Sequence, residues 1–539
     1  MHNILQTIAF LILFSGISFG FEFKNLAVQD SGRIKPLDSM ARDALVLLTG
    51  KKVFEGKDPS QTILSWLVTP ELWTKKIFIE VRNFELKSKL KLDSDRSTFS
   101  YSEISSASDL SNVFQELNDR KKSNPKLDPY FQAVQRLNNQ LSLFVAIAKG
   151  DYLPVMPVAD KNGAWKSPSQ FSDDENRLFA KLFSSEIKKL SLEKSSDFYN
   201  NSAAIELYTT LKSKFPEQYP DNYILELEVG YNEYHLFKLA WLLYILAAVL
   251  TVVISQSVGA RWTQFIRPKV LVLLGLVLHT IGFAIRMYIL KRPPVSNMYE
   301  TVIWVSWGAI VFSLLIEKIY RFKYVAMMGS ILGALALIVA DSAPTILDSG
   351  LHPLEPVLKS NLWLTIHVMV ITISYSAFFL ALGLGHLAMV QYLRPPAFRS
   401  KESLEILANA IYRAIQFGVV LLAPGIILGG IWADYSWGRF WGWDPKETWA
   451  LIVLLGYLAI VHGRLVGWLR SFGISVVAVI AFNLVIMAWY GVNYVLGAGL
   501  HTYGFGAGGV EYIAAFVALE ILFVSYVIVI RQAEKQVAI

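Results

Sequence analysis

Residues 432–449 read WADYSWGRFWGWDPKETW, and an apolar run long enough to cross a bilayer lies on either side of them. Five of the chain's 15 tryptophans fall in this stretch. Aromatic side chains gather at membrane interfaces, so a belt that anchors a loop is one interpretation. The density of the tryptophans, with glycines between them, favours a platform for a flat, apolar ligand. The stretch therefore predicts a functional loop at one face of a membrane.

The composition indicates a membrane protein. The chain has 539 residues, of which 54% are hydrophobic, and its mean hydropathy is +0.41, more apolar than ordinary soluble proteins. In such a chain the net charge of +7 sets membrane orientation, and no motif indicates nucleic-acid binding. The sequence contains no cysteine, which excludes disulfides, thiolate metal sites and cysteine nucleophiles.

Apolar runs of spanning length fill the second half of the chain, because about 20 helical residues cross roughly 30 Å of hydrocarbon. Basic residues follow every second run, as expected of cytoplasmic loops, and Lys291 and Arg292 on the opposite side are the exception. The intervening loops at 291–298, 342–362, 432–448 and 496–510 then lie outside, and 532–539 form a cytoplasmic tail. The runs are 236–256, 269–290, 299–317, 324–341, 363–391, 413–432, 449–468, 473–495 and 511–530.

The first half of the chain is polar. Residues 1–20 have an apolar core followed by small residues, which predicts a signal peptide or a retained N-terminal anchor. Residues 21–235 contain helical patterns at 104–121, 127–149 and 174–193 and predict a mostly α-helical extracytoplasmic domain. We therefore expect an all-α polytopic membrane protein with about nine transmembrane helices, its membrane domain spanning 236–531.

The acids of the tryptophan-rich stretch have two interpretations. Asp444, Pro445 and Glu447 match the N-cap, first and third positions of a helix start, which is a capping box. Acid–base catalysis by Asp444 and Glu447 is the weaker interpretation. The sequence alone leaves both open.

Histidines at the ends of the spans suggest metal ligation. His367 and His501 fall at the outer ends of the fifth and eighth spans, near the tryptophan-rich stretch, and would suit axial ligation of a haem. A single histidine in a membrane helix more commonly hydrogen-bonds a neighbour.

Other ionisable residues lie within the spans. His279 and His462 fall deeper in the membrane and could form a second haem site together or pair elsewhere. We interpret His386 as an interfacial residue. Arg286 either snorkels to the interface or neutralises a haem propionate.

Several motifs then point to one family. WGRFWGWDPKETW resembles the WWD signature of haem-handling proteins that assemble c-type cytochromes. The stretches LWLTIHVMVITISYSAF, GRLVGW after His462, WYGVNYVLGAGLHTYG and PVSNMYE narrow the resemblance to the CcsA/ResC type of System II. VQDSGRIKPLDSMARDAL, at 28–45, looks like the segment that precedes the CcsA module in fused CcsBA synthases.

The resemblance implies a haem lyase subunit, with holocytochrome c synthase activity as part of a complex. Haem b would be substrate and bound ligand, attached to the CxxCH motif of an apocytochrome c. His367 and His501 would be the outer axial ligands, and His462 a transmembrane ligand with His279 as the alternative partner. The family's cradle would correspond to Trp432, Trp437, Trp441, Trp443, Asp444, Glu447 and Trp449.

The resemblance also implies partners and a location. The ResB/CcsB half of the fused synthases, which supplies another transmembrane histidine, is not in this sequence, so we expect a separate subunit of that type to pair with His462. A thioredoxin-like thiol reductant and membrane lipid are further expected partners. The implied location is the bacterial inner membrane, with the N-terminal domain and the WWD loop on the periplasmic side.

Three other functions remain open from the residues. A bis-His electron-transfer membrane protein would need paired histidines at membrane depth, for which only His279 and His462 qualify. A haem exporter would carry haem without forming the thioether bonds. A secondary transporter without haem would need broken helices around a polar site at the midplane.

Overall fold

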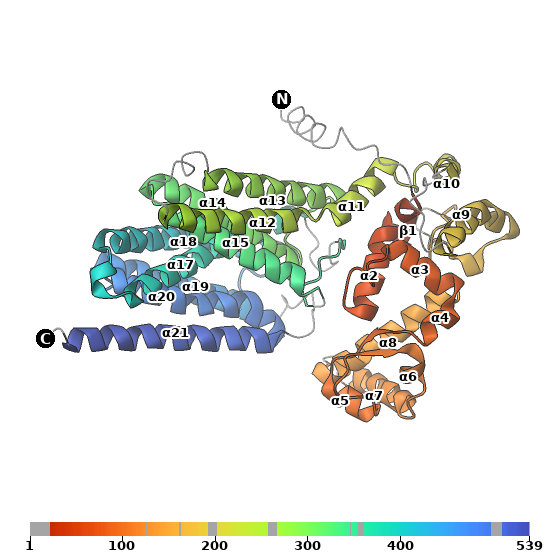
Figure 1. The fold of residues 1–539 in the computed structure, drawn as a ribbon, viewed down its shortest axis with the longest axis horizontal. Coiled ribbons are helices and arrows are strands. Elements are labelled where there is room, and N and C mark those ends of the chain that lie inside the picture. Colours follow the sequence, from red (N-terminus) through yellow and green to blue (C-terminus); the bar gives the residue numbers. More distant parts are fainter. Residues whose placement is uncertain are drawn as a thin grey trace. The chain divides into compact units, whose positions relative to one another are not determined.

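The computed structural model describes residues 22–123, 127–160, 163–191, 202–256, 267–344, 346–353, 361–496 and 509–537. The chain divides into two compact units, Met1–Tyr234 and His235–Ile539 (Figure 1). The predicted signal peptide or anchor at 1–20 and the last two residues of the predicted tail lie outside the described residues.

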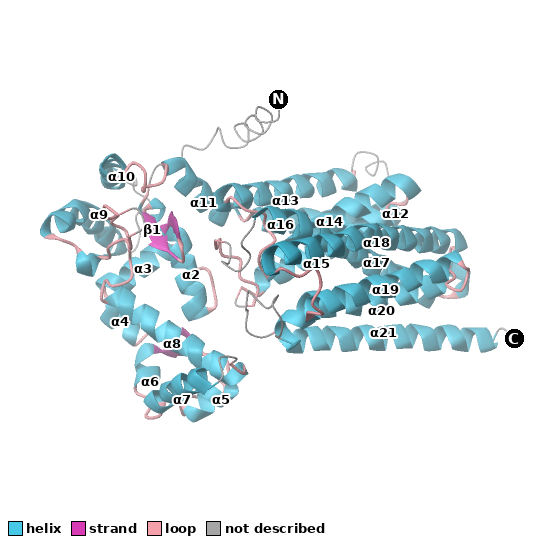
Figure 2. Cartoon of the chain, turned by 180° about the vertical axis from the view of Figure 1, so that it is seen from behind, coloured by secondary structure: helices cyan, strands magenta, loops and turns pink. Residues whose placement is uncertain are grey.

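The N-terminal unit is mostly helical, with two short two-stranded antiparallel sheets, β1 (Ala27–Asp30) with β2 (Arg33–Pro36) and β3 (Ile77–Glu80) with β4 (Thr98–Ser100) (Figure 2). Trp66, Trp73, Phe78 and Phe144 pack ring against ring in its core. Its helical elements are η1 (Phe23–Asn25), α2 (Leu37–Thr49), α3 (Pro59–Val68), α4 (Pro70–Thr74), α5 (Phe84–Lys89), α6 (Tyr101–Ser105), α7 (Leu110–Ser123), α8 (Pro129–Ala148), η2 (Pro168–Gln170), α9 (Asp173–Ser191), α10 (Ser202–Lys214) and α11 (Asn222–Tyr234).

The polar motif at 28–45 forms the β1–β2 hairpin and most of α2. The Lys35 side chain is fully buried and its ammonium lies 2.7 Å from Asp43 and 2.5 Å from Asp30. Burial alone would raise the pKa of the Asp30 carboxyl, but the Lys35 ammonium and the hydroxyls of Tyr152 and Ser31 hold it below its usual range. The charged side chains of Asp30, Lys35 and Asp43 therefore pair with one another within the N-terminal unit.

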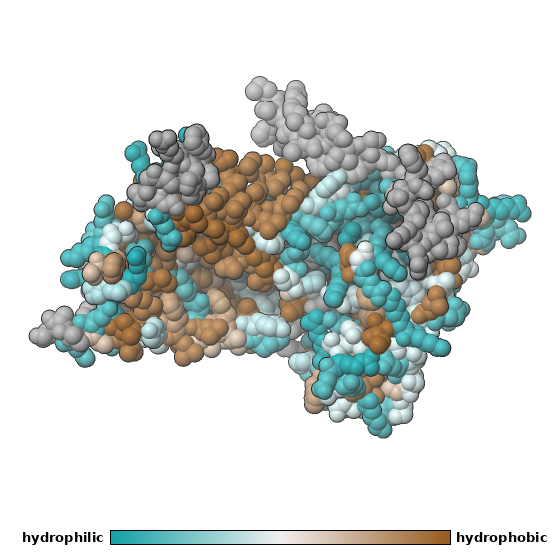
Figure 3. All heavy atoms as spheres, viewed as in Figure 1, coloured by the Kyte–Doolittle hydropathy of each residue, from teal (hydrophilic) through white to brown (hydrophobic). Residues whose placement is uncertain are grey.

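The C-terminal unit confirms the polytopic all-α fold. Within the described residues, nine helices are long and apolar enough to cross a membrane. Apolar side chains cover much of their exposed surface in Figure 3, whereas polar side chains dominate the surface of the N-terminal unit. The elements of this unit are α12 (Leu236–Gln256), α13 (Pro268–Leu290), α14 (Met298–Tyr320), α15 (Tyr324–Ser342), α16 (Asn361–Trp363), η5 (Leu364–Val368), α17 (Met369–Leu393), η6 (Pro396–Phe398), α18 (Lys401–Trp437), α19 (Pro445–Leu465), α20 (Ser471–Ile486), η7 (Met487–Leu496) and α21 (Val510–Val537).

These helices build two large apolar clusters and a small one around Val295 and Trp432. One large cluster joins α12, α13, α14 and α15, and the other joins α14, α15, α17, α18, α19, α20, η7 and α21. Small residues allow close helix contacts: a Cβ on Gly329 of α15 would meet Ser313 of α14 at 2.1 Å, and one on Gly308 of α14 would meet Ser376 of α17 at 2.4 Å. Helix α14 thus links the two large clusters.

The sixth span is longer than predicted. The apolar run 413–432 lies inside α18, whose 37 residues extend about 55 Å at 1.5 Å per residue. Residues 401–412 are amphipathic, with Leu404, Leu407 and Ile411 buried, so the helix begins before the apolar run. At its other end α18 continues to Trp437 and closes on Gly438 at φ 70°. The predicted loop 432–449 is therefore wrong in its first part, and the non-helical segment is 438–444.

Candidate functional site

A cavity lies where one end of α14, η5 and α17, α18, α19 and η7 meet. Three of the predicted site residues line it, namely His367, Trp441 and Glu447. Its walls combine apolar residues such as Ile371, Ile426 and Ala450 with polar ones, among them Ser296, Asn297, Thr301, Lys446 and Asn493. An amphipathic ligand is the kind that such a mixed lining suits.

His367 is held by the backbone of a neighbouring helix. Its Nδ1–H donates to the carbonyl oxygen of Gly425 at 2.9 Å, which leaves the lone pair of the neutral ring on Nε2. A Cβ on Gly429 would lie 2.5 Å from its Cε1, so this side of α18 must carry a glycine. Metal-ligating histidines commonly have their second ring nitrogen anchored in this way. His367 therefore fits an axial ligand.

Two π-helical segments face the cavity. His367 and Val368 belong to η5, and Ala488, Trp489 and Asn493 belong to η7. π-Helical turns are rare and occur frequently at functional sites, because the extra residue turns side chains away from the regular helical register. Trp489 also donates from Nε1 to Oγ1 of Thr301 at 3.0 Å, joining η7 to α14. Trp489 lies in the quoted stretch 489–504 but was not predicted as a site residue.

The five tryptophans of 432–449 do not form one platform. Trp432 is buried and packs against the His367 ring with centroids 5.8 Å apart, and its Nε1–H has no partner among the described residues. Trp441 lines the cavity. The other three, Trp437, Trp443 and Trp449, are not among the described lining residues. Trp443 is 69% exposed and has a left-handed backbone at φ 57°.

Glu447 organises the segment 438–444. Its carboxylate accepts hydrogen bonds from the backbone N–H of Gly442 at 2.8 Å and of Asp444 at 3.2 Å, and from the Arg439 guanidinium at 3.3 Å. Asp444 caps α19 in a complete capping box with Glu447. The capping interpretation of these acids is confirmed, and both carboxylates are engaged in holding the loop.

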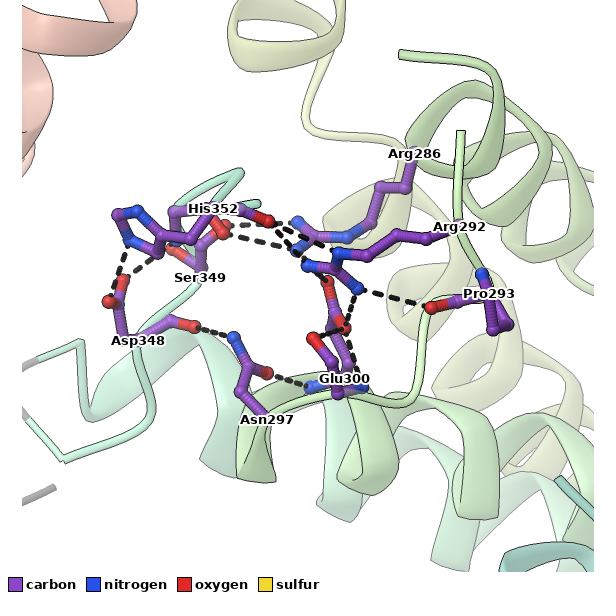
Figure 4. A network of polar contacts seen from close by, with 10 residues as sticks. Arg286, Arg292, Pro293, Asn297, Glu300, Asp348, Ser349 and His352 are labelled. Atoms are coloured by element: carbon purple, nitrogen blue, oxygen red, sulfur yellow. Dashed lines mark hydrogen bonds and ion pairs between the residues drawn. The ribbon is translucent and has the colours of Figure 1, made fainter. Parts of the chain in front are cut away.

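A buried ionic network braces the neighbouring wall (Figure 4). Glu300 accepts from Arg286 at 2.7 Å and Arg292 at 2.8 Å, and all three side chains are at most 2% exposed. Glu300 also accepts from the backbone N–H of Ser296 at 2.9 Å, which fixes the lining segment before α14.

The same arginines also hold the segment 349–352. Arg286 donates to the carbonyl oxygens of Ser349 and Gly350, and Arg292 to that of His352. The snorkelling interpretation of Arg286 is wrong, because its terminal nitrogens are buried and bond to Glu300 and these carbonyls. Its other interpretation, neutralisation of a haem propionate, stays a prediction. Glu300 was missed, although Asn297 and Glu300 have the spacing of a capping pair.

The two deep histidines occupy different clusters. His279 is fully buried in α13, stacked on Phe283 with the edge of Phe237 against it, and bonded to the Tyr244 hydroxyl at 3.3 Å. His462, near the end of α19, is exposed, with Nδ1 bonded to the Leu458 carbonyl of its own helix. The structure does not bring these two residues together, so the predicted intramembrane pair is not formed.

His386 is paired within the bundle. Its Nε2 lies 2.8 Å from Oε2 of Glu520 in α21, and its ring stacks on Phe523 with centroids 5.4 Å apart. The interfacial interpretation of His386 stays a prediction, and the structure adds Glu520 of α21 as its partner. Glu520 is an acid within the apolar run 511–530 and was not predicted to pair with His386.

Comparisons with known proteins identify the family. Residues 295–501 match the family described as cytochrome C assembly protein. CcsA of Guillardia theta is 34% identical over 235 residues, which cover 39% of this chain and 76% of that protein. CcsA of Synechococcus sp. strain CC9902 is 34% identical over 265 residues, covering 44% of this chain and 86% of that protein.

The chain belongs to the CcsA-type cytochrome c biogenesis proteins.

A longer relative extends the similarity. Protein NrfI of Wolinella succinogenes is 28% identical over 506 residues, which cover 90% of this chain and 54% of NrfI. The chain thus spans about half the length of NrfI. Every described residue that lines the cavity falls within the family match 295–501. The cavity is therefore part of the CcsA-type region.

The second predicted outer ligand of this CcsA-type protein, His501, lies outside the described residues. It follows η7, whose side chains already line the cavity. The pairing of His367 with His501 stays a prediction.

Proposed function

We propose that this CcsA-type protein holds haem b at the outer face of the bacterial inner membrane and attaches it to the CxxCH motif of an apocytochrome c. The observation that carries the proposal is His367, fixed by the Gly425 carbonyl on a π-helical turn beside the cavity. Membership of the cytochrome c assembly family supports haem as the substrate. The basic residues after alternate spans support a periplasmic position for the cavity end and the N-terminal unit.

The residues present fit a haem. His367 would supply one axial nitrogen and His501 the other, and the cavity wall offers the apolar and aromatic surface of Ile371, Ile426 and Trp441. The indole N–H of Trp432, whose ring packs against His367, is buried and has no partner among the described residues. The protein's contribution is to position the substrate, because ligation and packing on both faces fix the ring.

The bond-forming groups come from two other molecules. Each cysteine thiol of CxxCH adds across one haem vinyl group, the sulfur bonding the carbon next to the ring and the hydrogen going to the terminal carbon. Two thioether bonds form without net oxidation or reduction. This sequence has no cysteine to contribute, so a thioredoxin-like protein is proposed to keep the client thiols reduced.

We further propose that a ResB/CcsB-like membrane subunit pairs with His462. His462 is exposed on α19, and Leu465, Val466 and Trp468 beside it are 74%, 60% and 84% exposed. Exposed ionisable groups are costly when they face lipid, so a histidine on an outward surface favours a protein neighbour that brings a second ligand. The remaining surface of the bundle would face membrane lipid.

The test is cytochrome c assembly in a host without its own assembly system. The chain, the ResB-like subunit and a reporter apocytochrome c are produced together, and covalent haem on the reporter is measured by its peroxidase stain after denaturing electrophoresis. His367→Ala and His501→Ala should each abolish the stained product. His352→Ala is the matched control, since His352 lies in the outer segment 346–353 bonded to Asp348 and does not line the cavity.

Two outcomes would contradict the proposal. Stained reporter in both variants at the wild-type level would exclude ligation by these histidines. A purified wild-type complex that contains haem but never produces thioether-linked reporter would favour a haem exporter or a bis-His electron-transfer protein instead.

A further inference from the structure

Lys446 supplies an unmatched positive charge to the cavity. It is the only lysine or arginine among the lining residues that the structure describes. Its ammonium donates to the neutral Oδ1 of Asn493 at 2.8 Å and forms no ion pair with a described carboxylate. Shielding an ammonium from water is unfavourable unless an anion compensates for the lost hydration.

The other charges near the cavity are already matched. Glu447 also lines the cavity, but its carboxylate accepts from Arg439 and from two backbone N–H groups of the loop. Arg286 and Arg292 are engaged by Glu300 and by backbone carbonyls. Lys446 is therefore the cation best placed to receive a negatively charged group of a ligand.

We propose that Lys446 binds a carboxylate of the porphyrin substrate and so fixes how the ring is turned within its own plane. The inference rests on the proposed function, because it takes the ligand of the cavity to be haem. Axial ligation alone leaves the ring free to rotate about the iron–nitrogen axis. The two propionates of haem b lie on one edge of the ring, so holding that edge directs the vinyl groups to the other side.

Asn493 and Asn297 are two neutral polar residues of the cavity lining. Asn493 holds the Lys446 ammonium, and Asn297 caps α14 through the backbone N–H of Glu300 at 2.8 Å. Charge-assisted hydrogen bonds to carboxylates are stronger than neutral ones. A porphyrin with free carboxylates should therefore bind better than its neutral ester, and Lys446 should be the reason.

The experiment compares zinc protoporphyrin IX with its dimethyl ester. The full-length protein is placed in lipid nanodiscs, and each porphyrin is titrated by its own fluorescence. We expect the wild type to bind the free acid about tenfold more tightly than the ester, a ratio that corresponds to one modest charge-assisted contact. Lys446→Met should reduce that ratio to about one while leaving affinity for the ester within about twofold, and Lys446→Arg should keep most of the preference.

Two further variants make the result specific. Asn493→Asp places a carboxylate beside Lys446 and should also remove the preference, with the ammonium still present. Lys291→Met removes an exposed lysine of the outer loop 291–298 that does not line the cavity, and should leave the ratio unchanged.

The outcomes separate this inference from the proposed function. Equal binding of both porphyrins by the wild type, or equal losses for both in Lys446→Met, would overturn the role of Lys446 and leave the haem site standing. Binding of neither porphyrin by the wild type would overturn both. His367→Ala should weaken both porphyrins to the same degree, because it removes the axial ligand and leaves the carboxylate contact.

Discussion

At the residue scale, the carboxylate of Glu447 determines the path of the chain between the sixth and seventh spans. It accepts hydrogen bonds from two backbone N–H groups and one guanidinium, all within the segment 438–444. A Cβ on residue 442 would lie 1.5 Å from Nη1 of Arg439, so a larger residue than Gly442 would displace that guanidinium. The position of Trp441 at the cavity thus depends on a side chain that itself belongs to the helix start.

Replacing Glu447 with glutamine should loosen the loop without unfolding the bundle. The glutamine amide keeps the size of the glutamate side chain but loses its negative charge. Its NH₂ group would also face the N–H donors that now bond to the carboxylate. The lost contacts are worth about 1–3 kcal/mol, which corresponds to a roughly 5–150-fold rise in local opening. Hydrogen exchange of the 438–444 amides measures this rise. Glu405→Gln, an exposed change on α18, is the control, and unchanged exchange in Glu447→Gln would contradict the role assigned to the carboxylate.

The sequence predicted some residue-level features and missed others for a physical reason. The cap at Asp444 depends on four consecutive residues, so it was readable. The cavity partners of Lys446 and Trp489 come from other helices, Asn493 in η7 and Thr301 in α14. Such pairs depend on how distant segments pack, which spacing along one chain does not encode.

At the element scale, hydropathy located the nine spans but not their ends. Every predicted run falls largely within an observed helix, because apolar length alone defines a span. The first turns of α18 and the π-helical segments η5 and η7 were not predicted. Amphipathic extensions and an extra residue per turn leave the mean hydropathy unchanged, so they are invisible to that measure.

The ion network of α13 and α14 gives an element-scale prediction. Glu300→Gln leaves Arg286 and Arg292 buried without their shared carboxylate, so it should destabilise the outer end of the bundle by about 3–5 kcal/mol. The backbone amides of the segments 291–298 and 346–353 should exchange hydrogen faster than in the wild type. The thermal unfolding temperature of the protein in detergent should also fall.

The matched control for this variant lies on the same helix. Glu317→Gln, at the other end of α14, breaks a half-exposed pair with Lys269 at 3.1 Å and should cost less than about 1 kcal/mol. Similar losses in stability for the two variants would show that the buried network contributes no more than a surface pair.

At the scale of the whole molecule, the two large apolar clusters assign different roles to the deep histidines. His279 is enclosed by Phe237, Phe283 and Tyr244 in the cluster of α12–α15, where its ring acts as a packing residue. His462 is exposed on α19, which belongs to the other cluster. The positions of both histidines along the predicted spans place them in the membrane. Only the packing of the helices shows which of the two faces outward from the bundle.

This division predicts how haem within the membrane should respond to substitution. His279→Phe keeps an aromatic ring in the enclosed position and should leave the haem content of the purified complex with the proposed ResB-like partner near the wild-type level. His462→Ala removes the proposed outward ligand and should lower that content at least severalfold. The pyridine haemochrome spectrum, normalised to protein, measures both. His367→Ala perturbs the other proposed haem site, so its haem content per protein is the reference for the loss of one site. Equal haem loss in His279→Phe and His462→Ala would place the second ligand inside this chain and remove the need for a partner histidine.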